Sequence, residues 1–275
     1  MPIKTTALPP LTVPASDDVF PIVDISADTT KKITRENFLA GEPLPRAISF
    51  ADGGGVYTDT QYFTSSGSYV KPAGLKFVIV EGVGGGGGSG GIPSTTASQA
   101  TYAAGGGGGG YFYKKILASD LSASETVTVG AGGAGGAAGV NVGSDGTTTS
   151  FGAFCSATGG AGGSTFSAAT VTDPQFPLVG AGGTGTGGDL NITGSAGGAG
   201  QMSGANGRGV CGSGGASQLG GSRIGDSQQS DTGGKSALVG LLYGGGASAP
   251  GNGKSQSARA GGAGGAGIVI VNEYF

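Results

Sequence analysis

The sequence predicts a mainly β and irregular fold with few or no long α-helices, in which a small N-terminal module precedes a glycine-rich domain. Three observations support this prediction. Glycine accounts for 65 of the 275 residues, against an average usage near 7%. All but five of these glycines follow residue 70, and strand-like segments interrupt the glycine tracts. We therefore expect an N-terminal module over residues 1–70 and a glycine-rich domain over residues 71–275.

The N-terminal module carries weak signals of regular structure. Residues 1–18 are rich in proline and polar residues, which favours an extended arm. The sequence VFPIVDI predicts a short strand over 19–25, and a short helix is expected over 35–40, before a glycine and two prolines. The alternation of residues from 48 to 70 predicts hairpins. A module of this size cannot build a large core of its own, so we expect it to lean on a partner chain or on a larger assembly.

Strand-like segments indicate that the glycine-rich domain is not a flexible linker. Four segments are rich in β-branched and aromatic residues, at 75–83, 111–117, 125–129 and 267–275. Flexible glycine-serine linkers lack such residues. The first and last of these segments bracket the domain, which argues against the alternative that the tracts are disordered.

The glycines between these strands recur at every third position. This spacing is present in 130–139, 194–200, 209–215 and 261–267. Three residues per turn is the period of a polyproline-II helix, and glycine at the inward positions lets neighbouring backbones approach and bond. Collagen is excluded because the triplets are interrupted and proline is scarce. The domain is therefore expected to be a sandwich of short polyglycine-II helices bracketed by short β-strands.

Four polar inserts lie between the glycine tracts, at 92–103, 164–179, 216–232 and 247–260. Loops held on a rigid scaffold are where binding residues concentrate, and Ser, Gln, Arg and a few aromatic residues are typical of an adaptable binding surface. The alternative is that each insert is only a solvated turn. The candidate binding residues are Tyr102, Phe166, Gln175, Phe176, Gln218, Arg223, Gln228, Lys254 and Arg259.

The composition argues against catalysis. The chain has no histidine, which excludes a Ser-His-Asp triad, a Cys-His pair and a histidine metal site. Ser89 lies in a G-x-S-x-G match but has no histidine base, so the match arises from glycine content. Cys155 and Cys211 form no metal motif and are expected to be small buried apolar side chains. We therefore expect no enzyme activity, no cofactor and no bound metal.

The charge and hydropathy exclude two further classes. A net charge of −3 with 14 Lys and Arg residues argues against nucleic-acid binding, which needs a basic stripe. No apolar run approaches the roughly 20 residues that span a bilayer, so we expect no membrane insertion. The N-terminal residues lack an unbroken apolar segment, so we expect no secretory signal.

Four segments, in order along the chain, carry a more specific resemblance. FTSSGSYVKPAGLKFVIVEGVGGGGGSGG (63–91) resembles the opening of the glycine-rich domain at the ends of bacteriophage tail fibres. The segments 111–136 and 148–163 are similar to the middle of that domain, and GGAGGAGIVIVNEYF (261–275) is similar to its closing strand. The stretch VDISADTTKKITRENFLAG (23–41) resembles a short element of phage tail-fibre and baseplate-associated proteins.

This resemblance implies a virion protein at the tip of a tail fibre, made in the host cytoplasm, which binds a protein or glycan receptor on the bacterial outer surface. Our hypothesis is that residues 1–70 attach the chain to other phage tail or baseplate proteins. The glycine-rich part is also similar in kind to the tip adhesins of long-tailed phages, which cap a separate fibre, but this chain carries its own N-terminal module, so we expect a homotrimer. The candidate attachment residues are Val23, Ile25, Ile33, Phe38 and Leu39.

Other functions remain open at this point. The chain could be a structural or adaptor fibre protein of the virion without direct receptor contact. A cell-wall glycine-rich protein would carry repeats throughout, and the non-repetitive strands count against it. An ice-binding protein would carry a flat, regular face rich in Thr or Ala, and the irregular inserts count against it.

Overall fold

The computed structural model describes residues 19–24, 29–34, 58–171, 177–203 and 206–275. These residues form β-strands and irregular segments with no α-helix among them, which confirms the predicted fold class. The chain divides into two compact units, Met1–Tyr57 with Phe275, and Thr58–Tyr274. Each unit is described by itself below.

The first unit contains an antiparallel pair of strands, β1 (Val19–Asp24) and β2 (Thr29–Thr34), in which Val19 lies opposite Thr34. The expected strand over 19–25 therefore corresponds to β1. Of the candidate attachment residues, Val23 lies in β1 and Ile33 in β2. The remaining ones, the arm and the expected helix fall outside the described residues: Ile25, Phe38, Leu39, 1–18 and 35–40.

The second unit begins at Thr58, whereas the composition places the boundary after residue 70. The strands β3 (Thr58–Phe63) and β4 (Gly67–Val70) belong to this unit. The hairpin expected here is wrong for the described part of 48–70, because β3 and β4 do not pair with each other. β3 pairs with the last strand of the chain and β4 with β8. Alternation in a short segment predicts a strand but does not select its partner.

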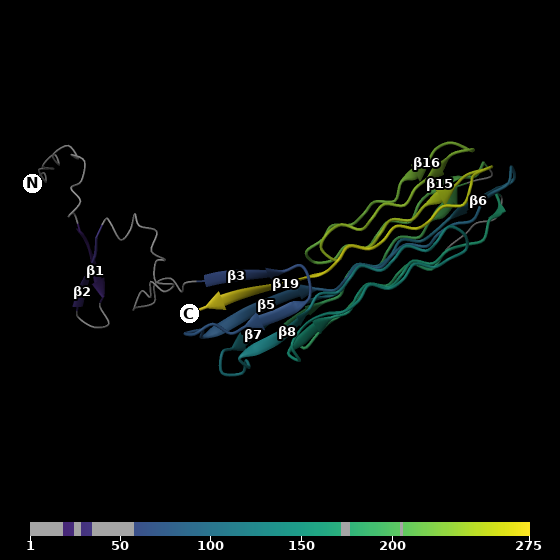
Figure 1. Cartoon of the computed structure of the whole chain (residues 1–275). Helices are drawn as coiled ribbons and strands as arrows, with labels where there is room; N and C mark the ends of the chain where they lie inside the picture. The colour runs from purple at the N-terminus through teal and green to yellow at the C-terminus, as the bar shows by residue number, and fades with distance from the viewer. Residues whose placement is uncertain (1–18, 25–28, 35–57, 172–176, 204–205) are drawn as a thin grey trace, which may run out of the picture. The chain divides into compact units, whose positions relative to one another are not determined.

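Two five-stranded sheets form one end of this unit, which we call the sheet end (Figure 1). The first has the order β13-β7-β5-β19-β3. Its strands besides β3 are β5 (Phe77–Val83), β7 (Tyr111–Leu117), β13 (Leu190–Ile192) and β19 (Ile268–Tyr274). The second has the order β12-β10-β9-β8-β4. Its strands besides β4 are β8 (Ser124–Thr128), β9 (Thr149–Phe151), β10 (Cys155–Ala157) and β12 (Gly185–Thr186). The four strands expected from composition are thus β5, β7, β8 and β19.

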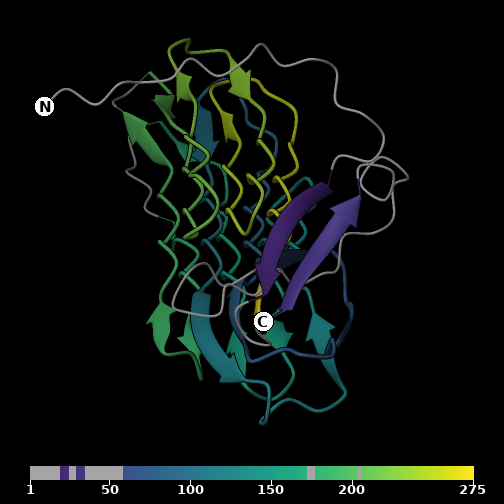
Figure 2. The ribbon, with the colours of Figure 1, turned by 90° about the vertical axis from the view of Figure 1, so that its left-hand side faces the viewer.

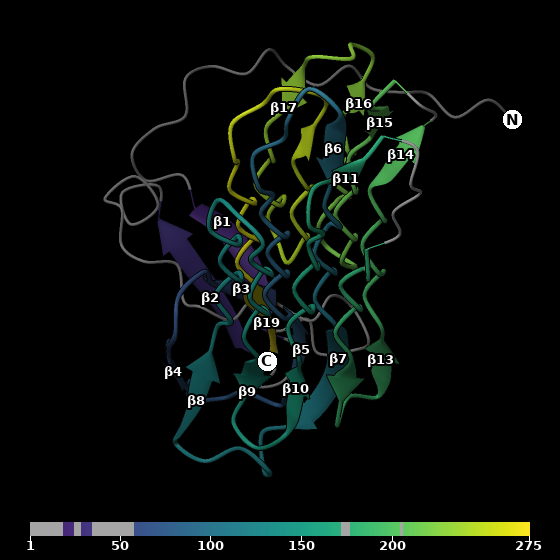
Figure 3. The same ribbon diagram turned by 90° about the vertical axis from the view of Figure 1, so that its right-hand side faces the viewer.

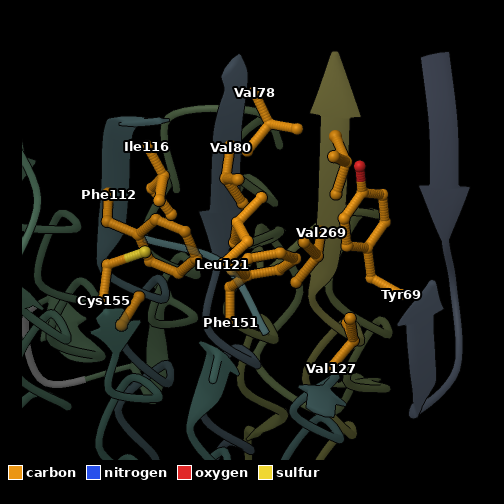
Figure 4. Packing of buried hydrophobic residues seen from close by; sticks show 12 residues of the cluster. Tyr69, Val78, Val80, Phe112, Ile116, Leu121, Val127, Phe151, Cys155 and Val269 are labelled. Carbon is orange, nitrogen blue, oxygen red and sulfur yellow. The ribbon is translucent and has the colours of Figure 1, made fainter. Parts of the chain in front are cut away.

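The main hydrophobic core lies between these two sheets. β5 and β19 each bury every second side chain, as expected for strands with one face on a core. The inward aromatic residues Tyr69, Phe112 and Phe151 pack there with Val80 and Val269 (Figure 4). Burial of a side chain of this size contributes about 1.5–3 kcal/mol, so this core anchors one end of the unit.

Glycine-rich segments run from the sheet end to the opposite end, side by side (Figures 2 and 3). Along residues 84–92, the backbone N–H groups of every third residue donate to the same neighbouring segment. Residues 84, 87 and 90 donate to carbonyl oxygens of 103–110. Residues 85, 88 and 91 donate to 141–148, and residues 86, 89 and 92 donate to 259–267, all at N···O distances of 2.8–3.2 Å. A period of three residues in the bonding is the signature of polyglycine-II helices packed around one another.

The helices are arranged in layers that follow from these hydrogen bonds. Helix 84–92 donates to three neighbours and accepts from three others, and helix 103–110 does the same. These two helices therefore lie at the centre of a hexagonal array. The helices group by their mutual bonds and contacts into four layers: 178–184, 158–165 and 141–148; then 193–200, 103–110, 84–92 and 130–139; then 211–217, 244–250 and 259–267; and finally 220–226 and 236–241.

Glycine is required in the central helices because the backbones approach so closely. A Cβ atom placed on Gly106 would lie 2.1 Å from the carbonyl oxygen of Gly87, and one on Gly87 would lie 2.0 Å from that of Ala161. No side chain can move aside at either position, because the obstacle is backbone. The glycines thus permit the hydrogen bonding that holds the array together.

We therefore expect Gly106→Ala to lower the free energy of unfolding by more than about 3 kcal/mol, at or beyond the upper end of ordinary overpacking costs. The matched control is Gly221→Ala in an outer helix, where the new Cβ would meet only the end of the Leu241 side chain, at 3.2 Å. The control is expected to change stability by less than about 1 kcal/mol. Urea unfolding of both variants measures the difference. Equal losses in the two would contradict the backbone-contact argument.

The two cysteines are free and buried, in agreement with the expectation of small apolar side chains. Cys155 lies in the core of the sheet end, and Cys211 lies beside Ala100 and Tyr102 near the opposite end. Burial raises the pKa of each thiol from its ordinary value of 9.0 to about 12. Both thiols are therefore neutral and shielded in the folded protein.

We expect neither thiol to react with a disulfide reagent at pH 8 in the native protein, and both to react in urea. A raised folded pKa also means that the neutral thiols contribute stability below pH 9, and that this contribution is lost as the pH rises from 9 toward 12. Thiol titration with and without denaturant tests the first expectation. Rapid reaction of either thiol in the folded protein would show that it is accessible.

Candidate functional site

The connections at the end of the helices opposite the sheet end form a surface that we call the loop end. Their described residues are 93–102, 138–140, 165–171 with 177, 201–203 with 206–210, 227–235 and 251–258. Short turns close the helices at the other side, at 217–220 and 242–244. Three of the four inserts expected to bind thus have their middles at the loop end. The fourth, 216–232, begins with a turn at the sheet end and reaches the loop end only in its last residues.

Two small sheets support the loop end, and strands of both lie together there (Figure 3). One has the order β11-β6-β18-β17 and the other β14-β15-β16. The strands of the first sheet are β6 (Gln99–Tyr102), β11 (Ala169–Thr170), β17 (Gly234–Lys235) and β18 (Gly251–Asn252). Those of the second are β14 (Gln201–Ser203), β15 (Arg208–Val210) and β16 (Ser227–Gln228). Segments from five different connections are therefore held in fixed register.

Tyr102 is a supporting residue and not part of the surface. Its side chain is fully buried, and its hydroxyl donates to the carbonyl oxygen of Gly207 over 2.8 Å. The ring lies against Gly209 and Gly251, where any side chain would collide with it. Burial raises the pKa of the Tyr102 phenol, and the nearby Cys211 adds to this effect. Tyr102 thus joins the hairpin of β14 and β15 to β6 and β18.

Arg259 and Asn252 form a second support. The Nε of Arg259 donates to Oδ1 of Asn252 over 2.8 Å, and the Nδ2 of Asn252 donates to the carbonyl oxygens of Pro93 and Ser257. Thr95 adds a hydroxyl bond of 2.6 Å to the carbonyl oxygen of Gly253. Side chains therefore hold segments 93–102 and 251–258 together. Of these, Arg259 was predicted to bind a receptor, and Asn252 and Thr95 were not predicted to have a role.

The other candidate residues are distributed over the unit. Gln228 is 3% exposed and donates to the carbonyl oxygen of Ser230, so it too supports a loop. Arg223 lies on outer helix 220–226 and donates to the carbonyl oxygen of Val239, which places it on the side of the array. Gln218 is exposed but lies in a turn at the sheet end. Gln175 and Phe176 lie outside the described residues.

Two of the candidates do lie at the loop end with accessible surface. Phe166 is 39% exposed. Lys254 is half-buried, and its N–H donates to the carbonyl oxygen of Asp231. Beside them the segment 96–98 is exposed. The structure therefore brings together parts of three expected inserts, with the buried candidates beneath them.

The hairpin over 201–210 was not recognised as part of the surface from the sequence. Asn206 and Gly207 directly precede β15, and this dipeptide is a general signal of a turn, so the sequence did carry a turn signal here. Arg208 in this hairpin forms an ion pair of 2.8 Å with Asp231 from the neighbouring connection. A second pair joins Lys235 to Asp226 over 2.8 Å, and its hydrogen bond lowers the pKa of the Asp226 carboxyl.

In its described segments, the loop end presents hydroxyl, amide and charged groups and one accessible aromatic ring, that of Phe166. Among the described residues, no three His, Cys, Asp or Glu side chains are placed to hold a metal ion. No helix long and apolar enough to cross a membrane is found in the part of the chain that the structure describes.

The fold and this surface define a class of protein: a glycine-rich polyglycine-II sandwich that is closed by β-sheets at one end and displays loops at the other. The sequence model of the family described as "Glycine-rich domain" matches residues 60–274. The chain therefore belongs to the glycine-rich domain family. No curated protein matches the chain.

We expect Tyr102→Phe to leave the glycine array folded but to loosen the hairpin over 201–210, because the Gly207 carbonyl loses its buried donor. The loss of such a hydrogen bond costs about 0.5–1.5 kcal/mol. Hydrogen exchange of segments 201–203 and 206–210 should rise several-fold, while exchange in helix 84–92 stays unchanged. Phe166→Ala serves as the control and should leave both segments as they are.

Proposed function

We propose that the chain is a phage tail-fibre adhesin whose loop end binds a receptor on the bacterial cell surface during adsorption. The observation that carries the proposal is the convergence of connections from separate parts of the chain on one end of a rigid scaffold. Loops on such scaffolds are where binding residues concentrate. The resemblance of the four ordered segments to phage tail-fibre tips points to the same role.

The scaffold suits a surface that has to change its specificity. Most bonds that hold the helices run between backbone groups, so substitutions in the loops leave them in place. The exposed residues at the loop end can vary while the supporting residues, such as Tyr102 and Arg259, keep the segments in register. A receptor-binding tip that meets new receptors needs this separation of stability from binding.

The proposal extends to assembly and location. We propose that the protein is part of the virion, that residues 1–57 and the short β-structure within them attach it to other tail or baseplate proteins, and that it assembles as a homotrimer. A fibre protein that serves as an adaptor without touching the receptor is the other reading of the resemblance. Binding to cells distinguishes the two.

The test uses the full chain, carrying a fluorescent label, on a panel of Gram-negative bacteria. We expect saturable labelling of particular strains. Loss of labelling after protease treatment of the cells would identify a protein receptor, and its persistence would identify a glycan. Labelling of no strain by folded protein would support the adaptor role.

On a strain that is labelled, we expect Ala97→Trp to reduce binding at least about tenfold, because a bulky side chain at the exposed centre of segment 93–102 obstructs close contact. Gln218→Trp introduces the same side chain at an exposed position in a turn at the sheet end, and it should leave binding unchanged. The apparent dissociation constant on cells is the quantity to compare. Equal effects of both variants would remove the loop end from the binding site.

A further inference from the structure

The five-stranded sheet β13-β7-β5-β19-β3 has a second face, which points away from the hydrophobic core. Side chains alternate between the two faces of a strand. Val78 and Val80 of β5 and Val269 and Val271 of β19 point into the core. The residues between them in these strands, and their cross-strand partners in β3, β7 and β13, therefore lie on the opposite side. We call this side the outer sheet face.

The outer sheet face is rich in aromatic side chains. Tyr62, Phe77, Tyr113 and Tyr274 come from four strands and are at least partly accessible, whereas Tyr111 on the same side is buried. Thr58, Thr60 and Asn272 add polar groups near the β3 edge. Phe77 and Tyr274 stack with ring centroids 4.4 Å apart. Tyr62 is 67% exposed, and at the opposite edge of the sheet Leu190 is 51% exposed. Aromatic enrichment with few charges distinguishes interface cores from the rest of a protein surface.

The charges on the outer sheet face are few and already satisfied. The strands place one acid and one base there, Glu81 and Lys115. Glu81 accepts a hydrogen bond of 2.8 Å from the Tyr111 hydroxyl, and the Nζ of Lys115 lies 4.0 Å from the centroid of the Phe77 ring. The face thus has no net charge from its strands. Copies of this face that turn toward a common threefold axis meet without like-charge repulsion, and the face offers no complement to a strongly charged partner.

The size of the face also fits an association between proteins. β5, β7 and β19 have seven residues each, β3 has six and β13 has three. At about 4.8 Å between strands and 3.3 Å per residue they cover roughly 480 Å². Val83, Tyr111 and Ile268, at the end next to the glycine helices, are buried within the chain, so the accessible area fits a contact at the small end of specific interfaces, which bury less than about 1,200 Å² in total.

We propose that the outer sheet face is the contact between copies of this chain. The inference rests on the homo-oligomer that forms part of the proposed function and locates its interface at the sheet end. A contact there leaves the loop end of every copy free. Several loop ends on one particle then bind a cell surface with the gain in avidity that linked sites provide.

The test compares the mass of the full chain, 26.0 kDa per copy, with that of two charge variants by analytical ultracentrifugation. The first variant combines Tyr62→Glu and Leu190→Glu, at exposed positions on the outer sheet face. The matched control combines Leu178→Glu and Ile224→Glu, which are 81% and 79% exposed on the outer layers of the glycine array. Circular dichroism and thermal unfolding of all three proteins report whether they are folded.

We expect an oligomer for the unmodified chain and for the control. The first variant should be a folded monomer, with self-association weakened at least about 30-fold. If that variant does not fold, Tyr62→Ser with Leu117→Ser removes apolar contact without adding charge, and it should weaken association in the same direction.

Three results would overturn the inference: a monomeric unmodified chain at high micromolar concentration, a first variant that stays oligomeric, or a control that dissociates equally. Persistence of the oligomer in folded variants would mean that other residues hold the copies together. Cell labelling by the same preparations is read separately. An oligomer that depends on the outer sheet face but labels no bacterium would support this inference and contradict receptor binding.

Discussion

Hydrogen bonds between the backbones of neighbouring glycine helices are the interaction on which the rest of this protein depends. Ordering a glycine costs more backbone entropy than ordering any other residue, and the helices bury few large side chains that could offset this cost. Each net hydrogen bond contributes about 0.5–1.5 kcal/mol. The array compensates by its density, because the N–H groups of the two central helices donate outward to three neighbours in turn. The largest hydrophobic core lies at the sheet end, where it fixes the starting register of the helices, and only small clusters of buried apolar residues lie toward the other end.

Backbone bonds and side-chain bonds have different roles at the loop end. The helices fix the positions of the first and last residues of each connection, and a small number of side chains hold the residues between them in place. Tyr102 and Arg259 act in this second role. Tyr102 bonds to Gly207, 105 positions away, and Arg259 bonds to Asn252, whose amide reaches Pro93, 159 positions away. A large or charged side chain in a glycine-rich loop is therefore not by itself a sign of ligand contact. Here the hydrogen bonds that a side chain makes to other segments, as well as its burial, separate support from display.

The sequence was sufficient for the class of fold because the signals it carries are local and periodic. Glycine at every third position in 130–139 and 261–267 reports a helix whose inward side has no room, and the strands at 75–83 and 267–275 show their alternation directly. The sequence does not predict the outer helix 236–241. It carries a single glycine, Gly240, in a run of larger residues, because an outer helix needs glycine only where it faces a neighbour. The same reason explains why 216–232 was taken as a single insert.

The candidate site was harder to predict, because exposure is a property of the assembled array. Tyr102 and Gln228 have the composition of surface residues in a loop, but the strands β15 and β18 cover one of them and a tight turn encloses the other. The sequence also does not show which strands pair. β3 pairs with β19, and the hydrogen-bonded residues Thr60 and Asn272 in these strands are 212 positions apart in the sequence. Only the folded structure brings such segments together.

The threefold period of the helices also sets the increments in which the protein can change length. Inserting one or two residues within a helix would rotate every later glycine out of its close contact, whereas inserting three adds a full turn and restores each residue to its face. A turn of such a helix advances about 9 Å. If both helices that flank a connection gain a triplet, that connection rises above its neighbours by one such step while the bonds below keep their pairing. The distance by which each connection projects from the loop end can thus change in steps of one helical turn, whatever the sequence of the connection.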